Sequence, residues 1–135
     1  LAYVVIFSYT GIMESIGPDY LRPDESTIPE KAFNANIALP FALLLAVLIA
    51  PISEEVFFRG FIFRAIESRW GVIIGATVSG LLFSLVHFNL GVFIPFCVIG
   101  MLFSFGYIYS KSLLTNITAH LLYNLIGALV SIFVI

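Results

Sequence analysis

The sequence predicts an all-α fold, a polytopic transmembrane helical bundle, and its composition supplies the main reasons. Of 135 residues, 61% are hydrophobic and only 10% are charged, and the mean hydropathy is +1.10. These values exclude an ordinary soluble domain. The apolar residues fall into long runs separated by short polar stretches. These runs predict about five membrane segments, the first of them truncated.

The charge balance and the cysteine content exclude further classes of protein. The net charge is -2 and the sequence has no basic run, so we expect no nucleic-acid partner. The single cysteine, Cys97, lies in an apolar run, and one cysteine forms neither an internal disulfide nor a cysteine-rich metal site. We interpret it as a packing residue.

The first apolar segment, residues 1–12, is shorter than the ~20 residues that cross a bilayer. Because the chain begins inside this run, we expect a spanning helix that is cut short and a fragment lacking its N-terminal part. Residues 14–36 hold five acids, two bases and three prolines, which predicts an acidic loop in water. The chain therefore divides into residues 1–36 and a membrane core, residues 37–135.

The core opens with a long helix, expected over residues 37–64. Pro51 lies inside it and removes one backbone hydrogen bond, so we expect a kink there. Residues 64–70 then mix charge with Trp70, which is typical of a segment at the level of the lipid headgroups.

Three further helices are expected over residues 71–88, 92–109 and 113–135. The first of these carries a face of small residues that lets another helix approach closely, formed by Gly71, Gly75 and Gly80. We expect this face to serve packing within the chain.

The basic residues of the connecting segments indicate the orientation. The connections after the second and fourth segments carry Arg64, Arg69 and Lys111, against Arg22 and Lys31 in the acidic loop. The positive-inside rule therefore puts the former connections in the cytoplasm and predicts a site that opens to that side.

Few polar side chains fall within the expected membrane segments. A charged group at bilayer depth costs roughly 2.5 kcal/mol or more, so such residues face a cavity lined by protein and are functional candidates. The set includes both histidines of the chain and consists of Glu54, Glu55, Arg59, His87, Asn116, His120 and Asn124. The pair of glutamates and the two histidines come from three different segments. This distribution favours one shared site over isolated core hydrogen bonds.

Helical spacing divides the two glutamates. Glu55 and Arg59 are four residues apart, so they can pair on one face. Glu54 lies about 100° around the helix from Glu55 and is free for other contacts. A purely structural acid–base cluster explains Glu55 and Arg59 but leaves Glu54 unexplained.

The last helix carries a polar and small stripe at spacings of four, four, three and four residues, formed by Asn116, His120, Asn124, Gly127 and Ser131. Such a stripe faces protein or water. Hydrogen bonding between helices, worth ~0.6 kcal/mol on average, is the alternative to a functional site.

These residue types suit hydrolysis of an amide bond without a serine or cysteine nucleophile. A glutamate in an apolar pocket, with a histidine opposite, can activate a water molecule. A second histidine and an asparagine amide can donate hydrogen bonds to a developing oxyanion. Glu54, His87 and His120 would also suit a catalytic zinc ion with three protein ligands, and the spacing leaves both mechanisms open.

Three short motifs in this order resemble the CPBP family of intramembrane proteases, also called the Abi or CAAX-protease family, which includes the Ras-converting prenyl-protein endopeptidases. The motifs are Glu54-Glu55-x-x-x-Arg59, Phe83-x-x-x-His87 and His120-x-x-x-Asn124. The resemblance covers residues 39–135 and shows no departure at these positions.

The resemblance implies a role for each matched residue. It assigns Glu54 and His87 to the attacking water, and His120 and Asn124 to the oxyanion. It also implies that Glu55 braces the site together with Arg59. We favour a mechanism without a catalytic metal, because water activation by Glu54 and His87 leaves the two groups of the last helix with a function; zinc remains the alternative cofactor.

The sequence thus predicts an intramembrane endopeptidase in contact with membrane lipid, acting on a peptide or protein substrate that is prenylated or related to bacteriocin processing. A non-catalytic membrane scaffold or self-immunity protein and a metal or proton carrier are the alternatives. Straight vertical helices would leave Glu54 ~15 Å, His120 ~10 Å and His87 ~24 Å deep, at ~1.5 Å per residue. A shared site therefore requires tilt, the Pro51 kink or a later start of the third helix.

Overall fold

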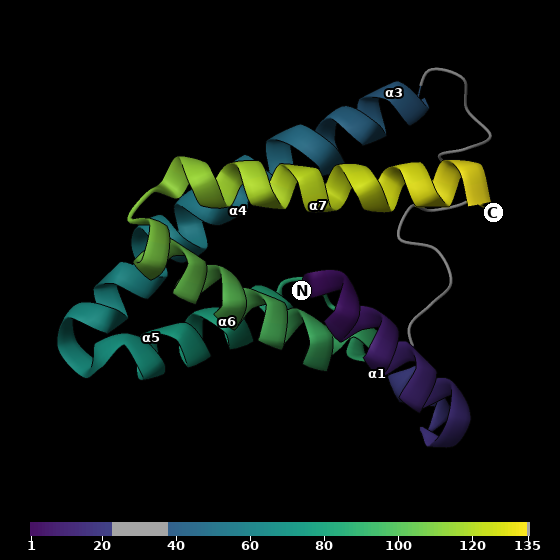
Figure 1. The fold of residues 1–135 in the computed structure, drawn as a ribbon, viewed down its shortest axis with the longest axis horizontal. Helices are drawn as coiled ribbons and strands as arrows, with labels where there is room; N and C mark the ends of the chain where they lie inside the picture. The colour runs from purple at the N-terminus through teal and green to yellow at the C-terminus, as the bar shows by residue number, and fades with distance from the viewer. Residues whose placement is uncertain (23–37, 135) are drawn as a thin grey trace.

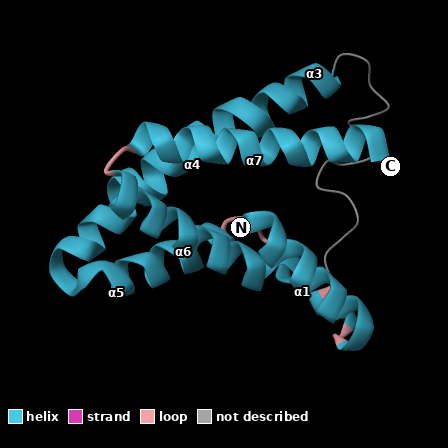
Figure 2. Ribbon diagram, viewed as in Figure 1, coloured by secondary structure: helices cyan, strands magenta, loops and turns pink. Residues whose placement is uncertain are grey.

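The computed structural model describes residues 1–22 and 38–134 of the chain. Within these two ranges the regular structure is entirely helical, with no strand, as Figures 1 and 2 show. The predicted all-α class is therefore confirmed. Most of the acidic loop, residues 23–37, lies outside the described residues.

The core opens with a helical run that continues for 48 positions, 38–85, and changes its hydrogen-bond pattern along the way. It comprises α3 (Ala38–Leu43), the π-helical η2 (Leu44–Ile49), α4 (Ala50–Glu55), the π-helical η3 (Val56–Phe63) and α5 (Arg64–Leu85). The two helices expected over residues 37–64 and 71–88 thus follow one another without a loop. The segment expected at the headgroup level, residues 64–70, is itself helical.

The direction of this run changes at Gly71. Its backbone dihedrals, φ 83° and ψ 171°, are non-helical and lie where a side chain would be strained. A single glycine therefore separates the two limbs at the position where a new helix was expected to begin.

The second limb ends earlier than expected. The sequence predicts helix through residue 88, but α5 ends at Leu85, so this expected boundary is wrong. Phe88 adopts a left-handed φ of 50°, and the Asn89 side chain accepts a hydrogen bond from the Gly91 amide at 2.8 Å. The chain reverses here because these residues cap a turn, and an apolar run alone does not reveal such a turn.

The remaining helices follow the sequence closely. A 3₁₀ turn, η4 (Leu90–Val92), leads into α6 (Phe93–Ser110), and α7 (Leu113–Val134) follows. At the N-terminus α1 (Ala2–Ile16) extends four residues beyond the expected segment and is followed by the 3₁₀ turn η1 (Asp19–Leu21).

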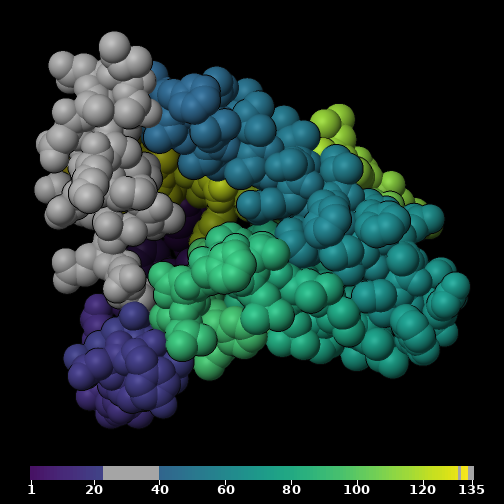
Figure 3. Space-filling view, turned by 180° about the vertical axis from the view of Figure 1, so that it is seen from behind, coloured from purple at the N-terminus to yellow at the C-terminus, as the bar shows by residue number. Residues whose placement is uncertain are grey.

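The helices pack as two pairs. In Figure 1, α5 and α6 run side by side in the lower part, while α7 crosses above them beside the run from α3 to α4; α1 lies against α6. The α5–α6 contact is close because glycines meet: a Cβ on Gly100 would lie 2.8 Å from the Cα of Gly80. Figure 3 shows the opposite face, with α7 in yellow visible behind the run that begins at α3.

Three helices of the described residues are long and apolar enough to cross a membrane, namely Pro40–Leu85, Leu90–Ser110 and Leu113–Val130. The first contains 46 residues and includes the turn at Gly71, whereas α1, with 15 residues, is shorter than a span. The expected count of about five membrane segments is therefore not confirmed.

Candidate active site

Glu55, the last residue of α4, lies at the centre of the polar groups within the bundle and is fully buried. Its carboxylate accepts hydrogen bonds from Arg59 Nη1 at 3.0 Å, His120 Nδ1 at 3.0 Å and Asn116 Nδ2 at 3.3 Å. The pairing with Arg59 is the one that their spacing predicts. The two contacts to α7 join helices that are more than 60 residues apart in the sequence.

Arg59 is equally buried and is held from several sides. Its Nη2 donates to the carbonyl of Gly100 on α6 at 2.9 Å. The guanidinium carbon lies 4.8 Å from the ring centre of Phe83 and 5.2 Å from that of Phe103, so two aromatic rings contact the cation. One carboxylate, one carbonyl and these rings thus surround the buried charge of Arg59, while its Nε has no hydrogen-bond partner among the described residues.

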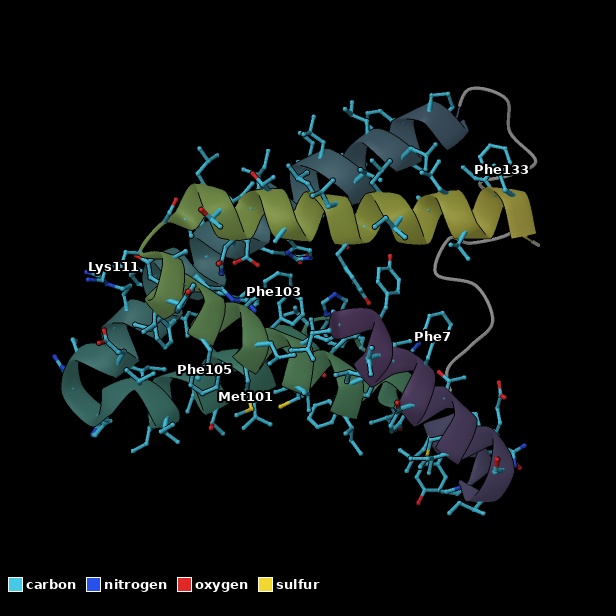
Figure 4. The ribbon with its side chains drawn as sticks, in the orientation of Figure 1. Phe7, Met101, Phe103, Phe105, Lys111 and Phe133 are labelled. Carbon is cyan, nitrogen blue, oxygen red and sulfur yellow. The ribbon has the colours of Figure 1, made fainter. Side chains whose placement is uncertain are left out.

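His120 lies between the two glutamates. Its ring stacks on Phe103 with 4.9 Å between the ring centres, and Figure 4 shows Phe103 projecting from α6 toward α7. Nδ1 contacts Glu55, and Nε2 lies 3.7 Å from Glu54 Oε2. Because a carboxylate paired with a guanidinium accepts a proton donor, Nδ1 carries a hydrogen, and Nε2 is the atom presented to Glu54.

Glu54 and Glu55 differ in exposure although they are neighbours in sequence. The side chain of Glu54 is 24% exposed, whereas that of Glu55 is 0% exposed. The rotation of about 100° between successive helical residues produces this difference. Glu54 is therefore the carboxylate that an incoming molecule can reach.

His87 lies beyond the end of α5, in the same aromatic cluster. Its Nδ1 is 2.8 Å from the carbonyl of Phe83, which only accepts hydrogen bonds, so Nδ1 carries the hydrogen. Its ring contacts Phe83 and Phe96, with ring centres 5.0 and 4.6 Å away. Among the described residues His87 forms no ion pair with Glu54; the ring of Phe83 contacts both histidines, with its centre 5.0 Å from that of His87 and 5.9 Å from that of His120.

Asn124 is held by a backbone carbonyl that Pro51 leaves without a donor. The Ala50 amide bonds to the carbonyl of Leu45, in the π-helical pattern of η2. In the same pattern residue 51 would bond to Ala46, but proline has no N–H. Asn124 Nδ2 donates to the Ala46 carbonyl at 2.8 Å instead. The interruption expected at Pro51 thus takes the form of a π-helical stretch that binds α7.

The residues named for a zinc site do not come together in this arrangement. Glu54 and His120 approach each other at 3.7 Å, and among the described residues no ion pair joins His87 to Glu54. Over residues 1–22 and 38–134 no three His, Cys, Asp or Glu side chains are grouped to hold a metal ion. The donor set therefore does not fit a three-ligand metal centre.

From sequence, Asn116 is a polar residue of a membrane segment and part of the stripe on the last helix, with no partner assigned to it. Asn116 contacts Glu55 and also donates to the carbonyl of Phe103 at 2.6 Å. Its position four residues before His120 is the signal that puts both on one helical face. Their shared partner on another helix cannot be found from that spacing. The side chain of Ser131, the last member of the stripe, is not among those described.

A family model matches most of the chain. The model of the Rce1-like family, the type II CAAX prenyl endopeptidases, matches residues 36–126. The chain belongs to this family. All three motifs lie inside the matched range, and the predicted resemblance to CAAX proteases is confirmed. No curated protein and no solved structure matches the chain.

Membership of the Rce1-like family establishes the broad activity. The chain is a CAAX-type intramembrane protease at the level of the family, and hence a hydrolase that takes a peptide or protein substrate. The membrane-embedded character of the family agrees with the three helices that can span a bilayer.

Proposed function

We propose that the chain cleaves a peptide bond within the membrane by means of a water molecule activated at Glu54. The observation that carries this proposal is the 3.7 Å approach of His120 Nε2 to Glu54 Oε2, with the opposite ring nitrogen on the buried Glu55. Glu54 is partly exposed, lies beside a histidine ring, and is not a member of the buried ion pair of Glu55 and Arg59. These are the properties that a general base needs.

In the proposed reaction the water oxygen bonds to the carbonyl carbon while one proton passes to Glu54. The same proton is then given to the leaving amine as the C–N bond breaks. His120, in its protonated form, donates from Nε2 to the developing oxyanion, and the charge of Glu55 stabilises the protonated ring.

The two other site residues take the roles that the family motifs imply. Asn124 has one amide hydrogen on the Ala46 carbonyl, which orients the amide and leaves the second hydrogen for the oxyanion. His87 has its proton on Nδ1, so Nε2 is suited to accept a hydrogen bond from the attacking water. We retain His87 as the second partner of the water on this ground.

For the substrate we propose a prenylated C-terminal peptide, with bacteriocin-related processing as the second candidate. Many apolar side chains of the helices around the site are exposed, as they are on a surface that faces lipid. A lipid chain attached to the substrate would have an apolar surface along which to lie. The basic residues of the connecting segments favour an approach from the cytoplasmic side.

The test is cleavage of matched prenylated and unmodified peptides by the purified chain in detergent. We expect Glu54→Gln to lower kcat by on the order of 10²–10⁴-fold, the usual contribution of a general base. Glu14→Gln, the same substitution at an exposed residue of α1, is the matched control. Retained cleavage in Glu54→Gln would overturn the mechanism.

A chelator series with the wild-type chain separates the two forms of water activation. Indifference to the chelator supports activation by Glu54 alone, whereas inhibition that zinc reverses supports the metal mechanism. If the wild-type chain cleaves neither peptide but carries protons or metal ions across a vesicle membrane, the carrier alternative replaces the protease. If it does neither, the scaffold alternative stands.

A further inference from the structure

Asn116 is the polar residue whose contacts the proposed reaction has not used. It lies one helical turn before His120 on α7 and is 3% exposed. Its Nδ2 atom donates to two oxygens, the Phe103 carbonyl at 2.6 Å and Glu55 Oε2 at 3.3 Å. Both partners are acceptors, so the orientation of the amide is fixed by chemistry, with its NH₂ group toward them.

Asn116 binds the carboxylate oxygen of Glu55 that Arg59 and His120 do not bind. Oε1 of Glu55 accepts from Arg59 Nη1 and from His120 Nδ1, while Oε2 accepts from Asn116. The terminal torsion of a glutamate is broad, so hydrogen bonds decide where the two oxygens lie. Among the described residues, Asn116 is the hydrogen-bond donor to Oε2, so its loss allows the carboxylate to rotate away from His120.

We propose that Asn116 is a positioning residue of the protease. It holds the Glu55 carboxylate so that Oε1 stays on Nδ1 of His120, which fixes the tautomer of that ring and directs Nε2 toward Glu54. Asn116 itself touches no reacting atom and acts through Glu55. The proposal rests on the proposed role of His120 in peptide hydrolysis.

A purely structural role for Asn116 makes a different prediction. Its 2.6 Å bond to the Phe103 carbonyl ties α6 to α7, and loss of this tie would weaken helix packing. That role would change stability but would leave the tautomer of His120 and the pH dependence of cleavage as they are. The tautomer of the His120 ring therefore distinguishes the positioning role from the structural role.

The direct test is the nitrogen spectrum of the histidine rings in the full chain, labelled with ¹⁵N-histidine. The sequence contains two histidines, so a His87→Gln variant assigns both signals. We expect the wild-type His120 signals to be those of a ring that keeps its proton on Nδ1. In Asn116→Ala we expect the spectrum to move toward the averaged tautomers of a free ring.

The matched control is Thr118→Val on the same helix. Thr118 is exposed, and its hydroxyl donates to the Leu114 carbonyl of its own helix, so its loss leaves the His120 signals unchanged. If Asn116→Ala does not fold, Asn116→Ser replaces it, because the shorter side chain cannot span the distance to Glu55. A wild-type His120 spectrum in either folded variant would overturn the proposal.

Kinetics supply the second readout. We expect Asn116→Ala to lower kcat by about 10-fold with little change in KM, and to shift the pH profile of kcat. In a Glu55→Gln background the same substitution should cost much less, because residues that act in series are not additive. Additive losses with an unshifted pH profile would contradict the proposal. If the wild-type chain cleaves no peptide, the proposed function fails, while the spectra still decide whether Asn116 positions His120.

Discussion

Replacing Arg59 with leucine tests whether the buried charge pair stabilises the bundle. The substitution leaves the Glu55 carboxylate fully buried without its cation and removes the hydrogen bond to the Gly100 carbonyl. Breaking a buried ion pair by removing one partner costs about 3–5 kcal/mol. For a chain of this size we expect the midpoint of thermal unfolding to fall on the order of 10 °C.

The assay uses the single cysteine of the chain. Cys97 is half-buried on α6, and its carbonyl lies 2.6 Å from a Cβ placed on Gly80, so its exposure reports separation of α5 from α6. A dye that fluoresces on reaction with thiols therefore follows unfolding in detergent. Arg69→Leu, the same substitution at an exposed residue, is the matched control and should leave the midpoint unchanged.

The double variant Arg59→Leu/Glu55→Leu tests whether the lost stability comes from the unpaired Glu55 carboxylate. Replacing both members of a buried pair with apolar residues is often neutral or stabilising, so the double variant should recover most of the lost stability. It should remain inactive, because Glu55 no longer orients His120. If Arg59→Leu melts at the wild-type temperature, or if the double variant is the least stable, the pair does not have the energetics assigned to it.

Two further substitutions test the backbone contacts. Pro51→Ala restores an N–H that competes with Asn124 for the Ala46 carbonyl; we expect kcat to fall about 3- to 10-fold, the value of one hydrogen bond, without loss of thermal stability. An unchanged kcat would contradict the role given to that carbonyl. Gly80→Ala puts a Cβ 2.6 Å from a backbone oxygen of α6 and should destabilise the bundle by about 1–3 kcal/mol in the thiol assay. Gly11→Ala, where nothing lies within 4 Å, is its control, and equal midpoints for the two variants would refute the close α5–α6 contact.

The sequence predicts the contacts that lie within one helix better than those between helices. The pair of Glu55 and Arg59 follows from a spacing of four residues, because that spacing puts both side chains on one face. The contacts of Asn116 and His120 to Glu55 depend on how α7 crosses α4, and no local pattern encodes that crossing. The sequence therefore assigns Glu55 to a brace, whereas the structure also makes it the partner of two residues on α7.

The sequence predicts the ends of helices well where a polar stretch interrupts the apolar run. It predicts them poorly where a turn is made from apolar residues. The start and end of α6 lie within two residues of the expected positions, because Lys111 and its neighbours interrupt the apolar run. The end of α5 was missed, since the turn at Phe88 continues an apolar sequence. This error matters for the site, because it changes His87 from a residue on a helical face to one in a capped turn.

The two adjacent glutamates have different physical environments. Glu55 is buried with Arg59, so the pair adds no net charge to the interior and gives His120 a fixed acceptor. Glu54 is the carboxylate left over, partly exposed and 3.7 Å from the other nitrogen of the same ring. A single imidazole thus connects a carboxylate held by three hydrogen bonds with one that is partly exposed.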